Sequence, residues 1–265
     1  MGLSNLTEVF DSIKVPYLDE IRDHLPISAT DKKDVDTYLK NVIDSILVNC
    51  GGRQYQFAYF GIHLLYMTYI YFSVQKISII IPNRYKDAVV FAKPYRSHKL
   101  DFNNLESTFD YSLVSEKELP NILKIVGLDS SQIDKIGNIV DTRNNMAHAS
   151  GKFEILTEDN FNVKVNAVVT SIRNIHGCMD KQLRFWFKDF LLRYCNHEFV
   201  DYGDIKDIIT EQMVQGFNLS VQELLVCNEM SVKPLIVDNP KFRDDLNKFK
   251  NILKEYCKNQ GYVSE

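Results

Sequence analysis

One short segment carries an arginine and a histidine that could act on a phosphodiester. Arg143, Asn144 and His148 belong to the sequence RNNMAH. An imidazole with an ordinary pKa can take the proton from a ribose 2′-OH or protonate a leaving 5′-oxygen. The planar, permanently charged guanidinium of Arg143 can stabilise charge that develops on the phosphate, and Asn144 can donate to a phosphate oxygen. The residue types indicate cleavage of RNA without a metal, because this reaction needs the 2′-OH.

The spacing of Arg143 and His148 limits how they can meet. Five positions apart on an ideal helix, their side chains point about 140° apart and lie about 7.5 Å apart along the axis. They could come together across a junction of two helices, especially between two copies of the chain. A purely structural interpretation also stands, since cations are favoured at a helix C-terminus and Gly151 could end the helix.

The elements that must position these residues are expected to be helices. Apolar residues at helical spacing predict helices over residues 31–50, 53–77, 116–126, from 129 or 130 into the motif, and over 157–197 as one helix or two. Gly51-Gly52 and Gly127 are expected stops, and Asp129 or Ser130 an N-cap. Residues 1–25 predict a short amphipathic start. The predicted fold class is all-α.

Further elements are expected after residue 200 and between residues 77 and 116. Three shorter helices are expected after residue 200, starting near Asp204, at the capping box of Ser220 and Glu223, and at Pro240 behind an Asn239 N-cap. Residues 82–116 predict a long loop with short pieces of structure. Residues 77–81 fit a strand or the end of a helix equally well.

Residues 57–74 form a run that is apolar apart from a few polar side chains. Its length approaches the ~20 residues that cross a bilayer, but it is rich in Tyr, includes His63 and has no flanking cluster of Lys or Arg. A helix that is apolar on nearly all sides is also typical of the centre of a bundle. The core helix is the favoured interpretation, and the membrane span is the alternative.

Composition and charge exclude some classes of protein. The chain has 265 residues, of which 45% are hydrophobic and 25% charged, an ordinary globular balance. Its 31 Lys and Arg against 35 Asp and Glu give a net charge of −4, which argues against a general nucleic-acid coat. Five widely spaced cysteines without a C-x-x-C predict neither a disulfide framework nor a structural zinc site. Reduced thiols in a cytoplasmic protein are expected.

Two further groups of residues are weaker candidates. Tyr55, Tyr59, His63 and Tyr66 form one helical stripe, which could line a cleft that faces the motif helix or form a buried polar seam. Basic and aromatic residues alternate in the long loop, where they could contact RNA or simply face water; they are Arg84, Tyr85, Lys86, Phe91, Lys93, Tyr95, Arg96, His98 and Lys99.

The motif in its context resembles the HEPN superfamily. That family has an Arg, usually a polar residue such as Asn after it, and a His four to six residues on; Arg143, Asn144 and His148 match these positions, and Ala147 and Gly151 fit the common form. The similarity covers about residues 30–197. It implies a bundle of four or five helices that dimerises through the motif helices. The expected domains are residues 1–200, a HEPN-like bundle with an insertion near 78–116, and residues 201–265, a helical extension.

The resemblance implies a metal-independent endoribonuclease without a cofactor. Its site would be shared by a homodimer, with His148 as acid and base, Arg143 as phosphate clamp and Asn144 as auxiliary. RNA, such as tRNA or mRNA, would be the substrate, in a toxin–antitoxin or antiviral defence role. The expected partners are a second copy and an antitoxin or defence-system protein, with no membrane. The alternative is a catalytically inactive HEPN-like scaffold or binding module in such a complex.

Overall fold

The computed structural model describes residues 15, 17–27, 33–90, 92, 94, 100–147, 155–199 and 201–263. Within these ranges every named element is a helix, and the β-type pairs are two isolated bridges, so the all-α prediction is confirmed. The α-helices are α2 (Leu18–Asp23), α3 (Lys33–Gly51), α4 (Tyr55–Ile80), α5 (Pro82–Val89), α6 (Ser130–Ala147), α7 (Glu158–Cys195), α8 (Ile205–Asp207), α9 (Val221–Glu229), α10 (Lys233–Asp238) and α11 (Arg243–Asn259). The 3₁₀ segments are η2 (Thr108–Leu113), η3 (Leu119–Val126) and η5 (Pro240–Phe242), and η4 (Ile208–Gly216) is a π-helix.

The chain divides into two compact units. Unit 1 comprises Met1–Arg22 and Lys32–Cys178, and unit 2 comprises Asp23–Asp31 and Met179–Glu265. The division falls within α7, which is one continuous helix. The domain limit expected near residue 200 stays a prediction.

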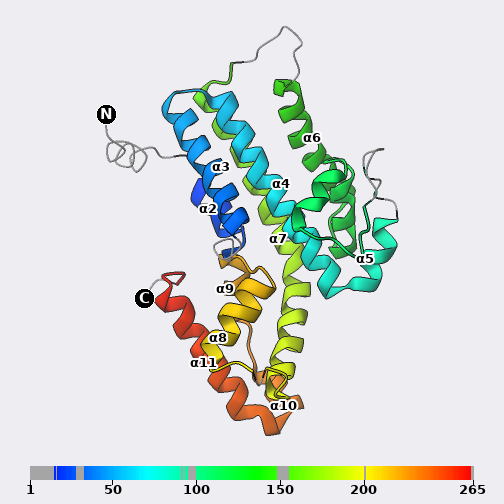
Figure 1. Ribbon diagram of the computed structural model, residues 1–265, viewed down its shortest axis with the longest axis vertical. Helices are drawn as coiled ribbons and strands as arrows, with labels where there is room; N and C mark the ends of the chain where they lie inside the picture. Colours follow the sequence, from blue (N-terminus) through cyan, green and yellow to red (C-terminus); the bar gives the residue numbers. More distant parts are fainter. Residues whose placement is uncertain are drawn as a thin grey trace. The chain divides into compact units, whose positions relative to one another are not determined.

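Helix α4 is the central helix of unit 1. It packs against α3, α5, α6 and the 3₁₀ segments η2 and η3 (Figure 1). It is long and apolar enough to cross a membrane, but 83% of its most apolar window is buried within the protein. This burial favours the core-helix interpretation. Gly61 permits close packing with α3, because a Cβ at that position would overlap Cγ1 of Ile46. Residues 77–80 are the end of this helix and not a strand.

Helix α6 brings the motif to unit 1. Its start is fixed by Asp129, whose Oδ1 accepts from the backbone N–H of Gln132 at 2.8 Å while Oε1 of Gln132 accepts from N–H of Asp129 at 2.9 Å. Reciprocal capping of this kind satisfies helix N–H groups that otherwise lack partners. One face of the helix is buried in the core through Ile133, Ile136, Ile139 and Val140. Gly127 ends the preceding η3, so the stop expected there is confirmed, and its φ of 115° is in the left-handed region.

The described part of the segment between α4 and η3 includes short helices, the short pieces of structure that were expected there. It contains α5, which starts at Pro82, and η2. Tyr85 on α5 is buried, with its hydroxyl 2.8 Å from that of Tyr111. The prediction that Tyr85 could stack on RNA is therefore wrong, because its ring belongs to the core. Arg84 and Lys86 on the same helix are exposed, whereas Phe91, Lys93, Tyr95, Arg96, His98 and Lys99 lie outside the described residues.

Unit 2 is built around an aromatic cluster formed by Trp186, Phe187, Phe190, Tyr194, Phe217 and Phe249. Helix α11 packs against α8, α9 and η5, and the capping box of Ser220 and Glu223 starts α9 as expected. Asn239 does not cap a helix through its side chain: its amide donates instead to the carbonyl of Leu235 at the end of α10. Asn239 nevertheless occupies the N-cap position of η5 before Pro240, so the expected start of a helix at Pro240 is confirmed.

Candidate active site

The motif lies at the C-terminal end of α6. Arg143 and Asn144 are in the last two turns of the helix, which ends at Ala147, and both side chains are half-buried. His148 lies outside the described residues, so the predicted meeting of Arg143 and His148 stays a prediction.

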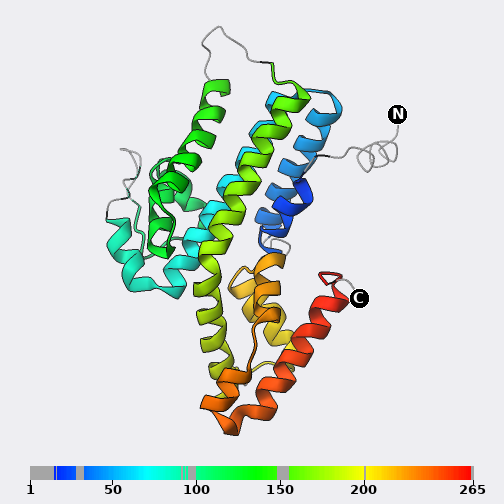
Figure 2. The same ribbon diagram turned by 180° about the vertical axis from the view of Figure 1, so that it is seen from behind.

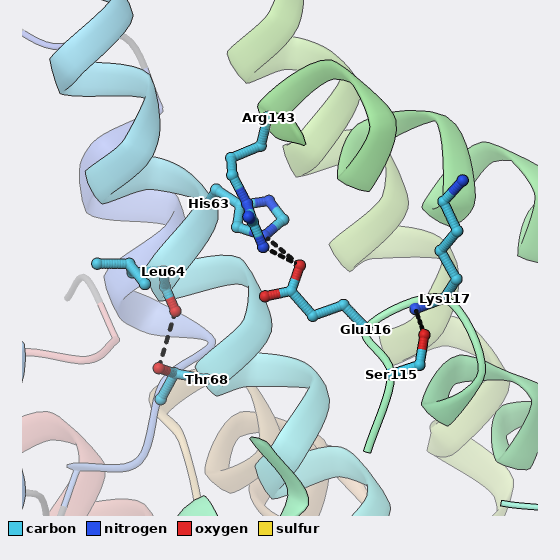
Figure 3. A network of polar contacts seen from close by, with 7 residues as sticks. All are labelled: His63, Leu64, Thr68, Ser115, Glu116, Lys117 and Arg143. Atoms are coloured by element: carbon cyan, nitrogen blue, oxygen red, sulfur yellow. Dashed lines mark hydrogen bonds and ion pairs between the residues drawn. The ribbon is translucent and has the colours of Figure 1, made fainter. Parts of the chain in front are cut away.

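Arg143 is the outer member of a three-residue polar network (Figure 3). Its Nη2 donates to Oε2 of Glu116, and Nε2 of His63 donates to the same oxygen at 3.1 Å. The residues come from three elements: His63 from α4, Glu116 from the segment before η3, and Arg143 from α6. Exposure of the side chains rises outward, from 1% for His63 to 23% for Glu116 and 26% for Arg143. The network therefore connects the core of unit 1 with the surface at the motif.

The contacts of this network keep Glu116 charged. Burial by itself would raise the pKa of Glu116, but the hydrogen bond from His63 and the charges of His63 and Arg143 outweigh it, so the pKa lies below its ordinary value of 4.5. Nδ1 of His63 is buried and finds no hydrogen-bond partner in the part of the chain that the structure describes. Nε2 is thus the one nitrogen by which His63 takes part in the network.

A second ion pair aligns the Glu116 segment with α6. Lys117 Nζ contacts Oδ1 of Asp141, and the backbone N–H of Lys117 donates to Oγ of Ser115 at 3.4 Å. Glu116 and Lys117 are adjacent and carry opposite charges. Each pairs with an oppositely charged residue of α6: Glu116 with Arg143, and Lys117 with Asp141. The Lys117 pair is about half exposed and solvent-screened, so it adds little energy but fixes the register of the segment.

The ion pair with Glu116 holds Arg143 in place but engages only part of its guanidinium group. A guanidinium has five N–H donors in a planar fork, and Glu116 accepts from Nη2. Glu116 is the acidic partner of Arg143 among the described residues, so other donors of the fork can still bind an anion such as a phosphate. The side chain has a fixed orientation at the end of α6, next to Asn144.

The tyrosine and histidine stripe of α4 forms the buried seam that was considered for it, and Tyr59 also lines a cavity beside α6, the other alternative. Tyr59 and Tyr66 are buried, and the Tyr66 hydroxyl lies 2.7 Å from Oγ of Ser171, whereas Tyr55 at the end of the stripe donates to Glu158. His63 is the member that also reaches the motif, through Glu116. Glu116 itself was not among the candidates, because it pairs across 27 residues with Arg143 and no sequence spacing marks it.

Among the described residues no group of three His, Cys, Asp or Glu side chains could hold a metal ion, and all five cysteines are free thiols. No family model, curated protein or solved structure matches the chain.

Proposed function

We propose that the chain is a metal-independent endoribonuclease of the HEPN type that acts as a cytoplasmic homodimer. One observation carries the proposal: the Arg of the motif is held at the end of α6 by Glu116, with donors left for a phosphate and with Asn144 beside it. His148 follows one residue after the end of this helix. Arg143 would clamp the scissile phosphate, Asn144 would assist it, and His148 would move the protons.

The reaction follows from the chemistry of these groups. One imidazole takes the proton from the ribose 2′-OH, whose oxygen then attacks the neighbouring phosphorus. The bond from phosphorus to the 5′-oxygen breaks, and that oxygen takes a proton from a second imidazole. The products are a 2′,3′-cyclic phosphate and a 5′-OH. A two-fold dimer would supply the second His and a second Arg, because an isologous interface places the same residues on both sides.

Single substitutions test this proposal by cleavage of tRNA or total RNA in the presence of EDTA. Arg143→Ala and His148→Ala should each slow cleavage by at least about a hundredfold, the usual contribution of an acid–base or charge-stabilising group. Arg173→Ala is the matched control, because Arg173 also begins an R-N sequence with a following His, but its ion-pair partner among the described residues is Glu20, away from the motif. Equal rates in all variants, or strict dependence on added metal, would refute the mechanism.

A second function is favoured by the same ion pair. Glu116 neutralises Arg143 in this structure, as it would in an inactive scaffold or binding module whose motif only joins helices. The toxin–antitoxin or antiviral role, with an antitoxin or defence-system partner, fits either form. Expression of the wild-type chain should be toxic if it cleaves RNA, and His148→Ala should relieve the toxicity. If the chain is a scaffold, expression of the wild type and of His148→Ala should be equally harmless.

A further inference from the structure

A cavity of about 370 Å³ lies in unit 1 beside the motif helix. Helix α6 and the first half of α7 form its walls, and both run alongside α4, which contributes Tyr59 (Figures 1 and 2). On α6 the lining positions follow a spacing of three, four and three: Gln132, Lys135, Ile139 and Thr142. On α7 they follow the same spacing: Lys164, Ala167, Ser171 and Asn174. One face of each helix thus looks into the same space, and the cavity ends one residue before Arg143.

The charge of this cavity is entirely positive. Lys135 and Lys164, one on each wall, are its charged lining residues, and no carboxylate belongs to the lining. Neither lysine makes an ion pair within the ranges the structure describes. In a chain of net charge −4, one lysine on each wall, neither with an acidic partner among the described residues, favours an anionic ligand.

The remaining lining is apolar with a few polar groups. Tyr59, Leu128 and Ile139 close the floor of the cavity with apolar atoms, each at most 5% exposed, and burial raises the pKa of Tyr59 to about 12, so its hydroxyl remains protonated. The amides of Asn138 and Asn174 can each donate and accept. A fatty acid would leave these amides without partners, and a bare inorganic anion would leave the apolar surface uncovered.

We propose that this cavity binds one nucleotide, with the phosphate near Lys135 and Lys164 and the base over the apolar floor, next to the amides of Asn138 and Asn174. Its volume lies at the lower end of the roughly 300–1,000 Å³ of small-molecule sites, which suits a single nucleotide. The nucleotide is either free or one residue of an RNA strand. The proposal goes beyond the endoribonuclease activity, because binding here needs neither Arg143 nor His148.

Calorimetric titration of the full chain with 5′-AMP, adenosine and inorganic phosphate tests the proposal. AMP should bind at least about tenfold more tightly than either of its halves, because only AMP uses both the lysines and the apolar surface. The absence of AMP binding, or binding of phosphate alone with equal affinity, would overturn it. If Arg143→Ala loses RNA cleavage but binds AMP as the wild type does, the result supports the proposed active site and leaves the nucleotide site unaffected.

Paired charge substitutions locate the bound nucleotide. The double variant Lys135→Gln with Lys164→Gln should weaken AMP binding by about tenfold or more, as expected for the loss of two charge-assisted contacts. Lys181→Gln with Lys188→Gln removes the same charge from exposed positions of α7 outside the cavity and should change the affinity less than about twofold. Equal weakening by both pairs would overturn the assignment to this cavity.

Competition distinguishes the two sources of the nucleotide. A single-stranded oligoribonucleotide is added to the His148→Ala chain, which is not expected to cleave it, after loading with AMP. Displacement of AMP from this chain and equally from the same chain with Lys181→Gln and Lys188→Gln assigns the cavity to a residue of an RNA strand. Retention of AMP assigns it to a free nucleotide. AMP binding of wild-type affinity in the Lys135→Gln, Lys164→Gln variant, displaced by the strand, would overturn the site.

Discussion

The polar network of unit 1 and the aromatic cluster of unit 2 are stabilised by different kinds of interaction. His63, Glu116 and Arg143 meet through two directional contacts on one oxygen atom, and exposure rises along the network. In unit 2, Phe187 and Phe249 are fully buried, and Trp186 stacks on Phe217 with centroids 3.9 Å apart. Burial of rings is nondirectional and strong, whereas a polar network is specific and depends on charge.

This difference shows where a functional group can be placed. A close-packed aromatic interior leaves no unpaired donor for a ligand. A network that starts on a buried imidazole and ends on a partly exposed guanidinium holds that cation still while part of it faces outward. Substitutions should therefore affect stability most in the aromatic cluster and function most in the polar network.

The largest stability effect is expected from Phe249→Ala. Phe249 has rings of Phe187, Phe190 and Tyr194 within 5.0–6.3 Å and is fully buried, so its removal creates a cavity. The free energy of unfolding should fall by about 3–5 kcal/mol in denaturant titrations. Phe185→Ala, at a position 64% exposed, is the control and should cost less than about 1 kcal/mol. Similar losses in both variants would contradict the cluster's role.

A smaller loss is expected from Glu116→Gln in the polar network. The amide keeps the shape but removes the charge that pairs with Arg143 and His63, so stability should fall by about 1–3 kcal/mol. If Glu116 orients Arg143 for catalysis, RNA cleavage should slow while dimer formation persists. Lys117→Ala removes the neighbouring, half-exposed pair and should cost less than about 1 kcal/mol. Equal effects of the two substitutions would show that burial of the network is unimportant.

The smallest predicted effect is a change in the free energy of unfolding with pH that arises from the ionisation of Glu116. Because its pKa is lower in the folded chain than the ordinary 4.5, its charge contributes stability that is present above pH 4.5 and is lost as the pH falls through the lowered folded value. The difference in unfolding free energy between wild type and Glu116→Gln should therefore shrink below pH 4.5. Glu118→Gln, at an exposed neighbouring position, is the control. A difference that stays constant with pH would contradict the network's electrostatics.

Local patterns predicted the main helices well. The stops at Gly51 and Gly127 and the capping box of Ser220 and Glu223 depend on neighbouring residues, and the structure confirms them. Of the two N-caps considered for α6, Asp129 forms the reciprocal cap. These features could be predicted because the atoms that determine them lie within a few residues of each other.

The elements that were missed depend on context that is not local. Pro82 was interpreted as the start of a loop, but proline is also suited to the first turn of a helix, and α5 begins there. Helix α10, with Pro234 in its first turn, was missed as well. Glu116 could not be assigned, because its partners lie 53 and 27 residues away and meet it only through the packing of α4 and α6. The RNNMAH motif identified Arg143 as a candidate, but not the carboxylate that orients it.

The rate of RNA cleavage in EDTA by His148→Ala relative to wild type tests the central claim most directly. The account predicts that wild type cleaves without metal and that His148→Ala is slower by at least about a hundredfold while remaining folded. Equal rates for the two proteins, or no cleavage by wild type until a metal is added, would contradict it.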